Sequence, residues 1–360
     1  NTLFFGPPSV AVYVDDVPFS DAFTYTSELL AVEDVDFHRG PQGAYFGRGG
    51  AAGLVAMRTV GPTDEQRFTL GGEFGSYDSV GLRFGSSGPL GGDFSHSLRV
   101  YYRERDGYVN NVFLNEHTDD RESMGVLANL FWRPCDEAEW RLRFLAESTD
   151  DGSQRLTSLF SPDPFTVSSN VPGETVIDRY QLSLHGRQDF GWGTAKSITS
   201  WQYWDLDPSI VDLDLTPLPA LESSSSIIQD QTYLTQEFRF ESADDGGRWG
   251  WQGGLFFSDK QTDGDSTRNF PVFNLPFSER TLFGIDEQVL AGFGSASFAA
   301  TDRLSFNAGV RIEYVESEID RSKDTSFGPG PAFGLEQDDW YFSPTGGLSY
   351  QVNDVTTVHA

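Results

Sequence analysis

Most of the chain alternates between apolar and polar residues with a period of two. The clearest case is 140–147, where Trp140, Leu142 and Phe144 alternate with residues that include Arg141 and Arg143. A period of two places successive side chains on opposite faces of a β-strand. The same alternation recurs at residues 94–103, 179–187, 234–241 and 304–314. The pattern therefore predicts a long series of strands, each apolar on one face and polar on the other.

The connections between these strands alternate in length. Short turns are predicted at 88–93, 134–138, 191–193, 243–247, 300–302 and 353–354. Long connections are predicted at 106–120, 150–176, 207–231, 262–286 and 317–340, whereas the first two strands join tightly near 76–79. Tight turns on one edge and long loops on the other are typical of an antiparallel transmembrane β-barrel. We expect roughly twelve strands and the start of another, each of about ten residues.

The tryptophans lie where a membrane barrel places its aromatic girdles. Those near short turns are Trp132, Trp140, Trp192, Trp249 and Trp251, and those toward the long connections are Trp201, Trp204 and Trp340. Aromatic residues at both strand ends are expected at the two membrane interfaces. A soluble β-sandwich also alternates, and a β-propeller would repeat a blade motif at a fixed period, which this sequence lacks.

The first sixty residues have a different organisation. They predict a strand at Val10–Val14, a turn at 15–18, an aromatic loop at 19–25, a short helix from Thr26 or Ser27 through Val32, and strands at 35–38 and 54–59. This segment has too few apolar residues for a convincing core of its own. We therefore expect it to pack inside or against something larger.

A glycine-dense loop at 39–50 carries two arginines, Arg39 and Arg48. A phosphate-binding loop would need Gly-Lys-Ser/Thr after the glycines, and a dinucleotide fingerprint would need a helix there. Neither is present, because the run that follows is β-like. Taken alone, the loop is a tight turn in which larger side chains would clash.

Composition excludes several classes of function. Lys and Arg number 25 against 54 Asp and Glu, for a net charge of -29, which argues against a nucleic-acid partner. Cys135 is the single cysteine, so the chain has no internal disulfide or cysteine metal cluster. The five histidines show no ligand spacing, and no nucleophile motif occurs, so we expect no enzyme, no cofactor and no bound metal. The acids between Asp205 and Gln231 either attract a cationic or metal-bearing solute or are simply solvated.

The glycine loop and its neighbours resemble a known family. Arg39-Gly40-Pro41-Gln42-Gly43, Gly47-Arg48 and the strand at 53–59 resemble the plug-domain signature of TonB-dependent outer-membrane receptors, and Val12–Pro18 resembles the plug strand before it. Gly88-Pro89-Leu90 and Arg105–Tyr108 resemble the first barrel strands of the same family. The resemblance covers the whole chain.

The resemblance implies a domain organisation and a location. Residues 1–61 would be the C-terminal part of a small mixed α/β plug domain, and 62–360 the N-terminal part of the barrel, with about 12–13 strands of an expected 22. Both ends look cut, so we expect a fragment of a longer protein. The expected location is the outer membrane of a Gram-negative bacterium, with the lipid bilayer and TonB as partners and a monomeric protein.

The resemblance also implies a function. The family imports scarce bulky solutes, most often ferric siderophores, and also cobalamin, haem or sugars. Arg39 and Arg48 would pair with inward-facing barrel acids, for which Glu147, Glu237 and Glu313 are equal candidates. Contact with the solute is expected from three aromatic residues of the loop before the helix, namely Phe19, Phe23 and Tyr25. The nearest alternative is a passive porin, which would have no use for a folded N-terminal unit.

Overall fold

A computed structural model describes residues 10–19, 32–40, 52–152, 163–218, 221–243, 246–272, 275–353 and 356–359. These residues form strands, turns and connections, with no helix among them. No helix of the described chain is long and apolar enough to cross a membrane. The predicted helix at 26–31 lies outside the described residues, and Val32 belongs to a strand.

The N-terminal sheet has four strands in the order β2-β1-β4-β3. Its strands are β1 (Val10–Val14), β2 (Val17–Pro18), β3 (Val32–Arg39) and β4 (Gly53–Thr59). β1 runs parallel to β4, while β2 and β3 are antiparallel to their neighbours. The core is small, with Ala11, Tyr13 and Leu54 buried together, in agreement with the expectation that this segment needs a larger partner.

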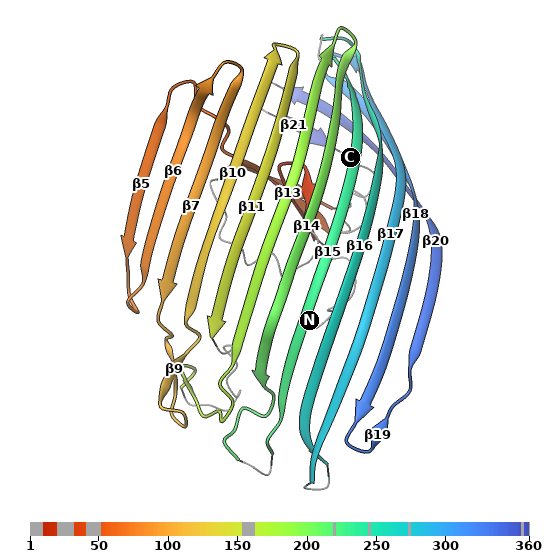
Figure 1. The fold of residues 1–360 in the computed structure, drawn as a ribbon. Coiled ribbons are helices and arrows are strands. Elements are labelled where there is room, and N and C mark those ends of the chain that lie inside the picture. Colours follow the sequence, from red (N-terminus) through yellow and green to blue (C-terminus); the bar gives the residue numbers. More distant parts are fainter. Residues whose placement is uncertain are drawn as a thin grey trace.

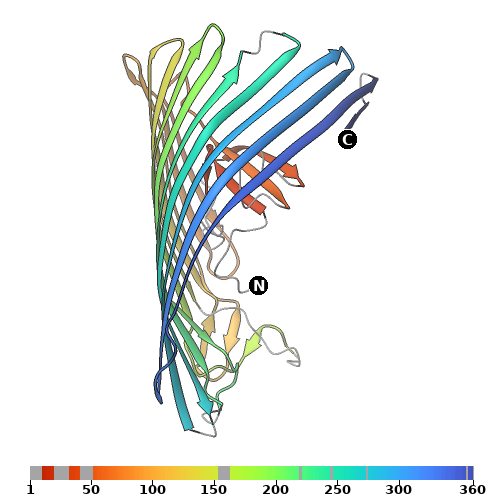
Figure 2. The same ribbon diagram turned by 90° about the vertical axis from the view of Figure 1, so that its right-hand side faces the viewer.

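The second sheet is large, antiparallel and strongly curved. Its main strands are β5 (Arg67–Phe74), β6 (Val80–Gly91), β7 (Phe94–Arg105), β10 (Arg121–Cys135), β11 (Ala138–Gly152), β13 (Glu174–Phe190), β14 (Gly193–Asp212), β15 (Ser224–Ser242), β16 (Trp249–Val272), β17 (Leu275–Thr301), β18 (Leu304–Thr325), β20 (Phe333–Asn353) and β21 (Thr356–His359). Each pairs with the next along the chain, and β19 (Gly328–Pro329) pairs with β18. The N-terminal sheet lies on the concave side (Figures 1 and 2).

The burial pattern is inverted relative to a water-soluble sheet. On β11 and β13 the apolar side chains Leu142 and Leu184 are 44% and 43% exposed, while Arg143 and Ser183 on the other face are 2% and 1% exposed. Exposing apolar surface on this scale is unfavourable in water, so the convex face suits lipid. The predicted alternation is confirmed, with the apolar face outward and the polar face lining the lumen.

The short turns of the described chain fall where the sequence predicts them, and so does the long connection at 106–120. The other four long connections are shorter than predicted. The connection expected at 262–286 is almost entirely strand, because β16 and β17 pair as far as Val272 and Leu275. The strands reach 27 residues in β17, well beyond the expected ten. These extensions carry polar residues on both faces, so the period-two pattern fades there although the backbone ladder continues.

Aromatic pairs mark both ends of the apolar band. Trp192 stacks on Trp251 near the short turns, with ring centroids 6.1 Å apart, and Tyr314 contacts Trp340 toward the other end at 5.2 Å. Trp204 departs from the girdle prediction. It points into the lumen, is 1% exposed, and donates its indole N–H to Gln231 Oε1 at 3.1 Å.

Connections at the long-loop end are joined to one another by a three-stranded sheet of β8 (Val109–Asn111), β9 (Glu116–Thr118) and β12 (Thr166–Val167). β12 pairs in parallel with β8, which links the connection after β7 to the one after β11. Ser169 Oγ donates to Asp212 Oδ2 at 2.5 Å at the end of β14. Three connections therefore share one hydrogen-bonded network.

Candidate functional site at the interface of the two sheets

The tight turn between β1 and β2 carries two consecutive acids toward the barrel wall. Asp15 and Asp16 both have left-handed backbones, with φ of 51° and 64°. Positive φ at both central residues is the requirement of the type I′ hairpin turn, and aspartate tolerates it better than most residues. The turn is also hydrogen-bonded to β4, because Asp15 N–H donates to Met57 O at 2.8 Å.

Asp15 is buried and fully engaged. It is 4% exposed, and its carboxylate accepts hydrogen bonds from Thr59 N–H at 3.0 Å and from Thr59 Oγ1 at 2.6 Å. The same carboxylate lies 3.4 Å from Arg141 Nη1 and 3.4 Å from Arg143 Nη1, both on β11. Arg143 also donates to the carbonyl of Val14 at 3.3 Å. One carboxylate therefore joins β4, the hairpin and the barrel wall.

Two opposing effects set the ionisation of Asp15. Burial disfavours the charged form and is the largest single effect, but the Arg143 and Arg141 guanidinium groups and the two Thr59 hydrogen bonds together outweigh it. The pKa of the Asp15 carboxyl is therefore lower than its ordinary value, and the group is ionised at neutral pH.

Asp16 contacts a different strand of the wall and is more exposed. Its Oδ1 lies 3.5 Å from Arg239 Nη1 on β15, and its side chain is 46% exposed. Arg239 has a closer partner on its own strand, Glu237, at 2.6 Å. Solvent screens the Asp16 pair, and Arg239 keeps a counter-charge without it, so this contact is the weaker of the two.

Two further strands hold the same hairpin. Gln202 of β14 donates from Nε2 to the carbonyl of Pro18 at 2.8 Å. Arg179 of β13 lies over the ring of Phe19, 4.7 Å from its centroid, in a cation–π contact. Four consecutive barrel strands thus contact the β1–β2 hairpin and the residue after it, β11 through two arginines and β13, β14 and β15 through one polar side chain each.

The three barrel acids named from the sequence each have an arginine partner within the barrel. Glu147 pairs with Arg179, Glu237 with Arg239, and Glu313 with Arg311 at 2.8 Å. Arg39 ends β3, and Arg48 lies outside the described residues. Pairing of Arg39 or Arg48 with one of these acids stays a prediction.

The remaining predicted residues divide between the described and undescribed parts of the chain. Gly40 has a φ of 81°, a left-handed backbone that favours glycine, and its N–H donates to Ala52 O at 3.2 Å. Phe19 lies against Arg179, and its contact with a solute stays a prediction. Outside the described residues lie Pro41, Gln42, Gly43, Gly47, Phe23 and Tyr25.

The sequence reasoning treated Asp15 and Asp16 only as turn residues and did not identify them as anchors. Their partners are far away in the chain, up to 223 positions for Asp16 and Arg239. The available signal was a pair of adjacent acids at the tip of a predicted N-terminal turn, together with arginines at polar-face positions of several predicted strands. In the described chain no cluster of three or more His, Cys, Asp or Glu is arranged to hold a metal.

An antiparallel barrel wall of the membrane type, with a small sheet bound to its inner face, defines the class as an outer-membrane β-barrel protein. Residues 136–360 match the TonB dependent receptor-like, beta-barrel family, and the chain belongs to it. Members of this family lie in the outer membrane of Gram-negative bacteria and are receptors, not enzymes. The predicted family, barrel fold and location are thereby confirmed.

Similar proteins include the pesticin receptors of Yersinia. The one from Yersinia enterocolitica is 24% identical over 332 residues, which cover 86% of this chain and 45% of the relative. The ferric yersiniabactin uptake receptor FyuA from Yersinia pestis has a TM-score of 0.84 at 21% identity, covering 99% of this chain and 55% of that structure. The siderophore receptor PiuA from Acinetobacter baumannii has a TM-score of 0.78 at 12% identity, covering 96% and 55%.

The chain thus spans about half the length of the curated relatives it matches. The division into a plug part at 1–61 and a barrel part at 62–360 stays a prediction. In the structure, the last strand of the N-terminal sheet ends at Thr59 and the first strand of the large sheet begins at Arg67.

Proposed function

We propose that the protein to which this chain belongs imports a ferric siderophore or a similar iron complex across the outer membrane, with energy supplied through TonB. One observation carries the proposal. The lumen side of the wall holds a separate small sheet through discrete polar anchors, led by Asp15 with Arg141 and Arg143. A passive porin needs no such fastened sheet, whereas an energised receptor needs an obstruction that can be held and released.

Similar solved structures support an iron complex as the solute. They include a ferric yersiniabactin uptake receptor, a siderophore receptor and a ferric citrate transporter. Uptake of a sugar, cobalamin or another nutrient through the same gate is the alternative, and the uptake experiment separates the two.

The direct test is iron uptake in the source organism. A strain lacking the gene should take up less radioactive iron from siderophore-conditioned medium than its parent, and a strain lacking TonB should lose the same uptake. Complementation with the full-length gene should restore it. Unchanged iron uptake in the deletion strain would remove the siderophore proposal, and uptake that persists without TonB would favour a passive channel.

Within this function we assign the glycine loop, with Arg39 and Arg48, to the side of the plug that fastens it to the wall. Phe19, Phe23 and Tyr25 are proposed as solute contacts. If alanine at each of the three aromatic positions left the affinity of the full-length receptor for its iron complex unchanged, the proposed contact would be wrong.

A further inference from the structure

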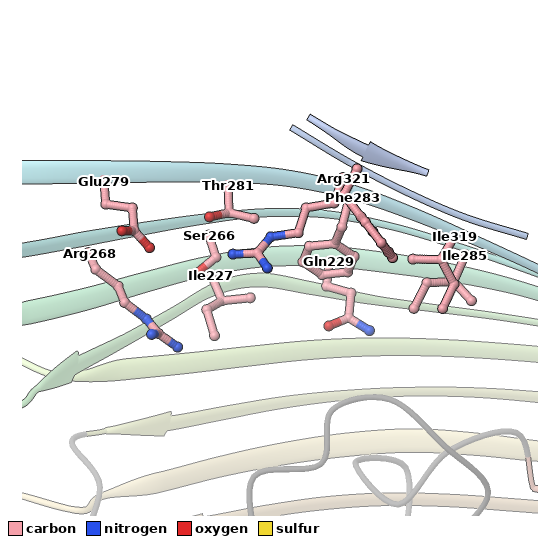
Figure 3. Close-up of a pocket in the computed structure, with 11 residues that line it drawn as sticks. Ile227, Gln229, Ser266, Arg268, Glu279, Thr281, Phe283, Ile285, Ile319 and Arg321 are labelled. Carbon is pink, nitrogen blue, oxygen red and sulfur yellow. The ribbon is translucent and has the colours of Figure 1, made fainter. Parts of the chain in front are cut away.

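A cavity of about 380 Å³ lies in the barrel wall toward the long-loop end, on the lumen face of β15, β16, β17, β18 and β20 (Figure 3). Its lining is mainly apolar, with Ile227, Phe283, Ile285, Ile319 and Phe333. Ligand pockets are typically apolar with a few placed polar groups. Among the described residues the lining comes from the barrel strands, and it includes none of the anchors of the N-terminal sheet.

The central row of the cavity follows the register of the sheet. Gln229 of β15 is opposite Gly264, Gly264 is opposite Phe283, and Phe283 is opposite Arg321. A side-chain Cβ at position 264 would overlap the ring of Phe283. The glycine therefore lets this ring lie across β16 beside Gln229, where it forms an aromatic surface of the cavity.

Gln229 has no hydrogen-bond partner although it is buried. Its side chain is 1% exposed, and neither Nε2 nor Oε1 is hydrogen-bonded. A buried polar group without a partner costs about 1–3 kcal/mol. Most buried polar groups have a partner, so this one needs an explanation. A ligand that offers both a hydrogen-bond acceptor and a donor would satisfy the carboxamide.

The side chains of two arginines line the same cavity without a polar partner in the described chain. Arg268 and Arg321 line the cavity, and within the described chain their guanidinium groups have neither a hydrogen bond nor an ion pair. The acid of the lining, Glu279, is paired with Lys323 at 2.6 Å. By contrast, Arg143 and Arg239 at the interface of the two sheets both have acidic partners. The planar fork of arginine is suited to a carboxylate or another paired oxygen anion.

We infer that this cavity binds a hydroxylated aromatic acid group, as a subsite for one part of the imported solute. The assignment rests on the proposed function for the arrival of a solute at this end of the barrel. The ring packs against Phe283 and Phe333, the acid group binds Arg268 or Arg321, and the ring hydroxyl exchanges hydrogen bonds with Gln229. A solute built only from aliphatic carboxylates would leave the aromatic surface unused.

The test is titration calorimetry on the purified full-length protein in detergent, with dihydroxybenzoate as the aromatic probe and citrate as the non-aromatic anion. Gln229→Leu and Arg321→Gln should each weaken dihydroxybenzoate binding at least about tenfold, or about 1.4 kcal/mol. Arg280→Gln is the matched control, because Arg280 is exposed and paired with Asp265 at 2.6 Å, and it should leave the affinity unchanged. Gly264→Val, which displaces Phe283, should abolish binding.

Three outcomes would overturn the inference: no dihydroxybenzoate binding, equal affinity for citrate and dihydroxybenzoate, or unchanged affinity in Gln229→Leu and Arg321→Gln. The proposed function is judged separately by iron uptake. If uptake depends on TonB while these variants bind and import normally, the subsite is wrong and the function stands. If the probe binds as expected while iron uptake is unaffected by gene deletion, the function is wrong and the subsite stands.

Discussion

Asp15 and Asp16 are consecutive, but they meet the barrel wall differently. Asp15 is 4% exposed and is the acidic partner of Arg143, which is itself 2% exposed. In the full-length protein, Asp15→Asn would leave Arg143 buried without that counter-charge, at a cost of up to about 3–5 kcal/mol. We expect small-solute leak through the barrel to begin at a lower urea concentration, as measured by conductance in planar bilayers.

Asp16→Asn is the matched control, because this side chain is 46% exposed and Arg239 keeps Glu237. Asp16→Asn should change the stability of the attachment by no more than about 1 kcal/mol. The double variant Asp15→Asn with Arg143→Gln also removes the buried guanidinium charge. Its loss of stability should therefore be smaller than the sum of the losses in the two single variants. Equal leak in Asp15→Asn and wild type would rule out this carboxylate as an anchor.

The Asp15 carboxylate makes the attachment of the N-terminal sheet to the barrel wall depend on pH. The pKa of Asp15 is lowered in the folded protein, because the arginines and Thr59 outweigh burial. A lowered pKa contributes stability above the unfolded value, about 3.9, and that stability is lost as the pH falls through the folded pKa. Leak should therefore stay constant from about pH 8 to 5 and rise only below about pH 4. A rise between pH 7 and 5 would indicate a different titrating group.

At the scale of elements, the sequence predicts the strands better than their ends. Period two is clearest in β7, β11, β13, β15 and β18, because within the membrane one face meets lipid and the other meets polar groups. In the extended part of β16 and β17 that contrast is lost, and the segment at 262–286 was wrongly predicted to be a loop. Backbone pairing continues there without a hydrophobic pattern, so the pattern could not reveal it.

A further prediction at the scale of elements concerns the three-stranded sheet of β8, β9 and β12. Ser169→Ala removes the hydroxyl that donates to the buried Asp212 carboxylate, which should cost about 1–3 kcal/mol of local stability. Because β12 pairs with β8, faster amide exchange should appear in both 109–111 and 166–167. Ser168→Ala, at a half-buried neighbour, should leave both segments unchanged. Faster exchange confined to 166–167 would show that the connections are not coupled.

For the whole molecule, lipid on the convex face decides which substitutions are tolerated. Leu184→Arg places a charge on the membrane-facing side, where the cost is about 2–4 kcal/mol near the midplane. Leu213→Arg is the control, since Leu213 is 51% exposed against 43% for Leu184 but lies beyond the end of β14. Urea titration of the full-length protein in lipid vesicles should show a large decrease in the free energy of unfolding for Leu184→Arg and almost none for Leu213→Arg. Equal losses would mean that both positions meet the same solvent.

The candidate site was less predictable than the fold for a reason that also belongs to the whole molecule. The sequence identified Arg39 and Gly40 through the family resemblance, and it placed Arg141 and Arg143 on the polar face of one strand. It could not show that Asp15 contacts that strand, because no local pattern encodes which residue of the N-terminal sheet faces which part of the wall. The unpartnered Gln229 carboxamide likewise depends on five strands coming together.

The two acids of the β1–β2 turn are joined by a single peptide bond, and this adjacency has a mechanical consequence. A force that draws the N-terminal sheet away from the wall reaches β11 through Asp15 and β15 through Asp16 at nearly the same point of the backbone. Two bonds loaded side by side share the tension and resist together, whereas bonds spaced along a strand break one after another. The turn therefore behaves as a single fastening that holds up to a threshold force and then detaches in one event.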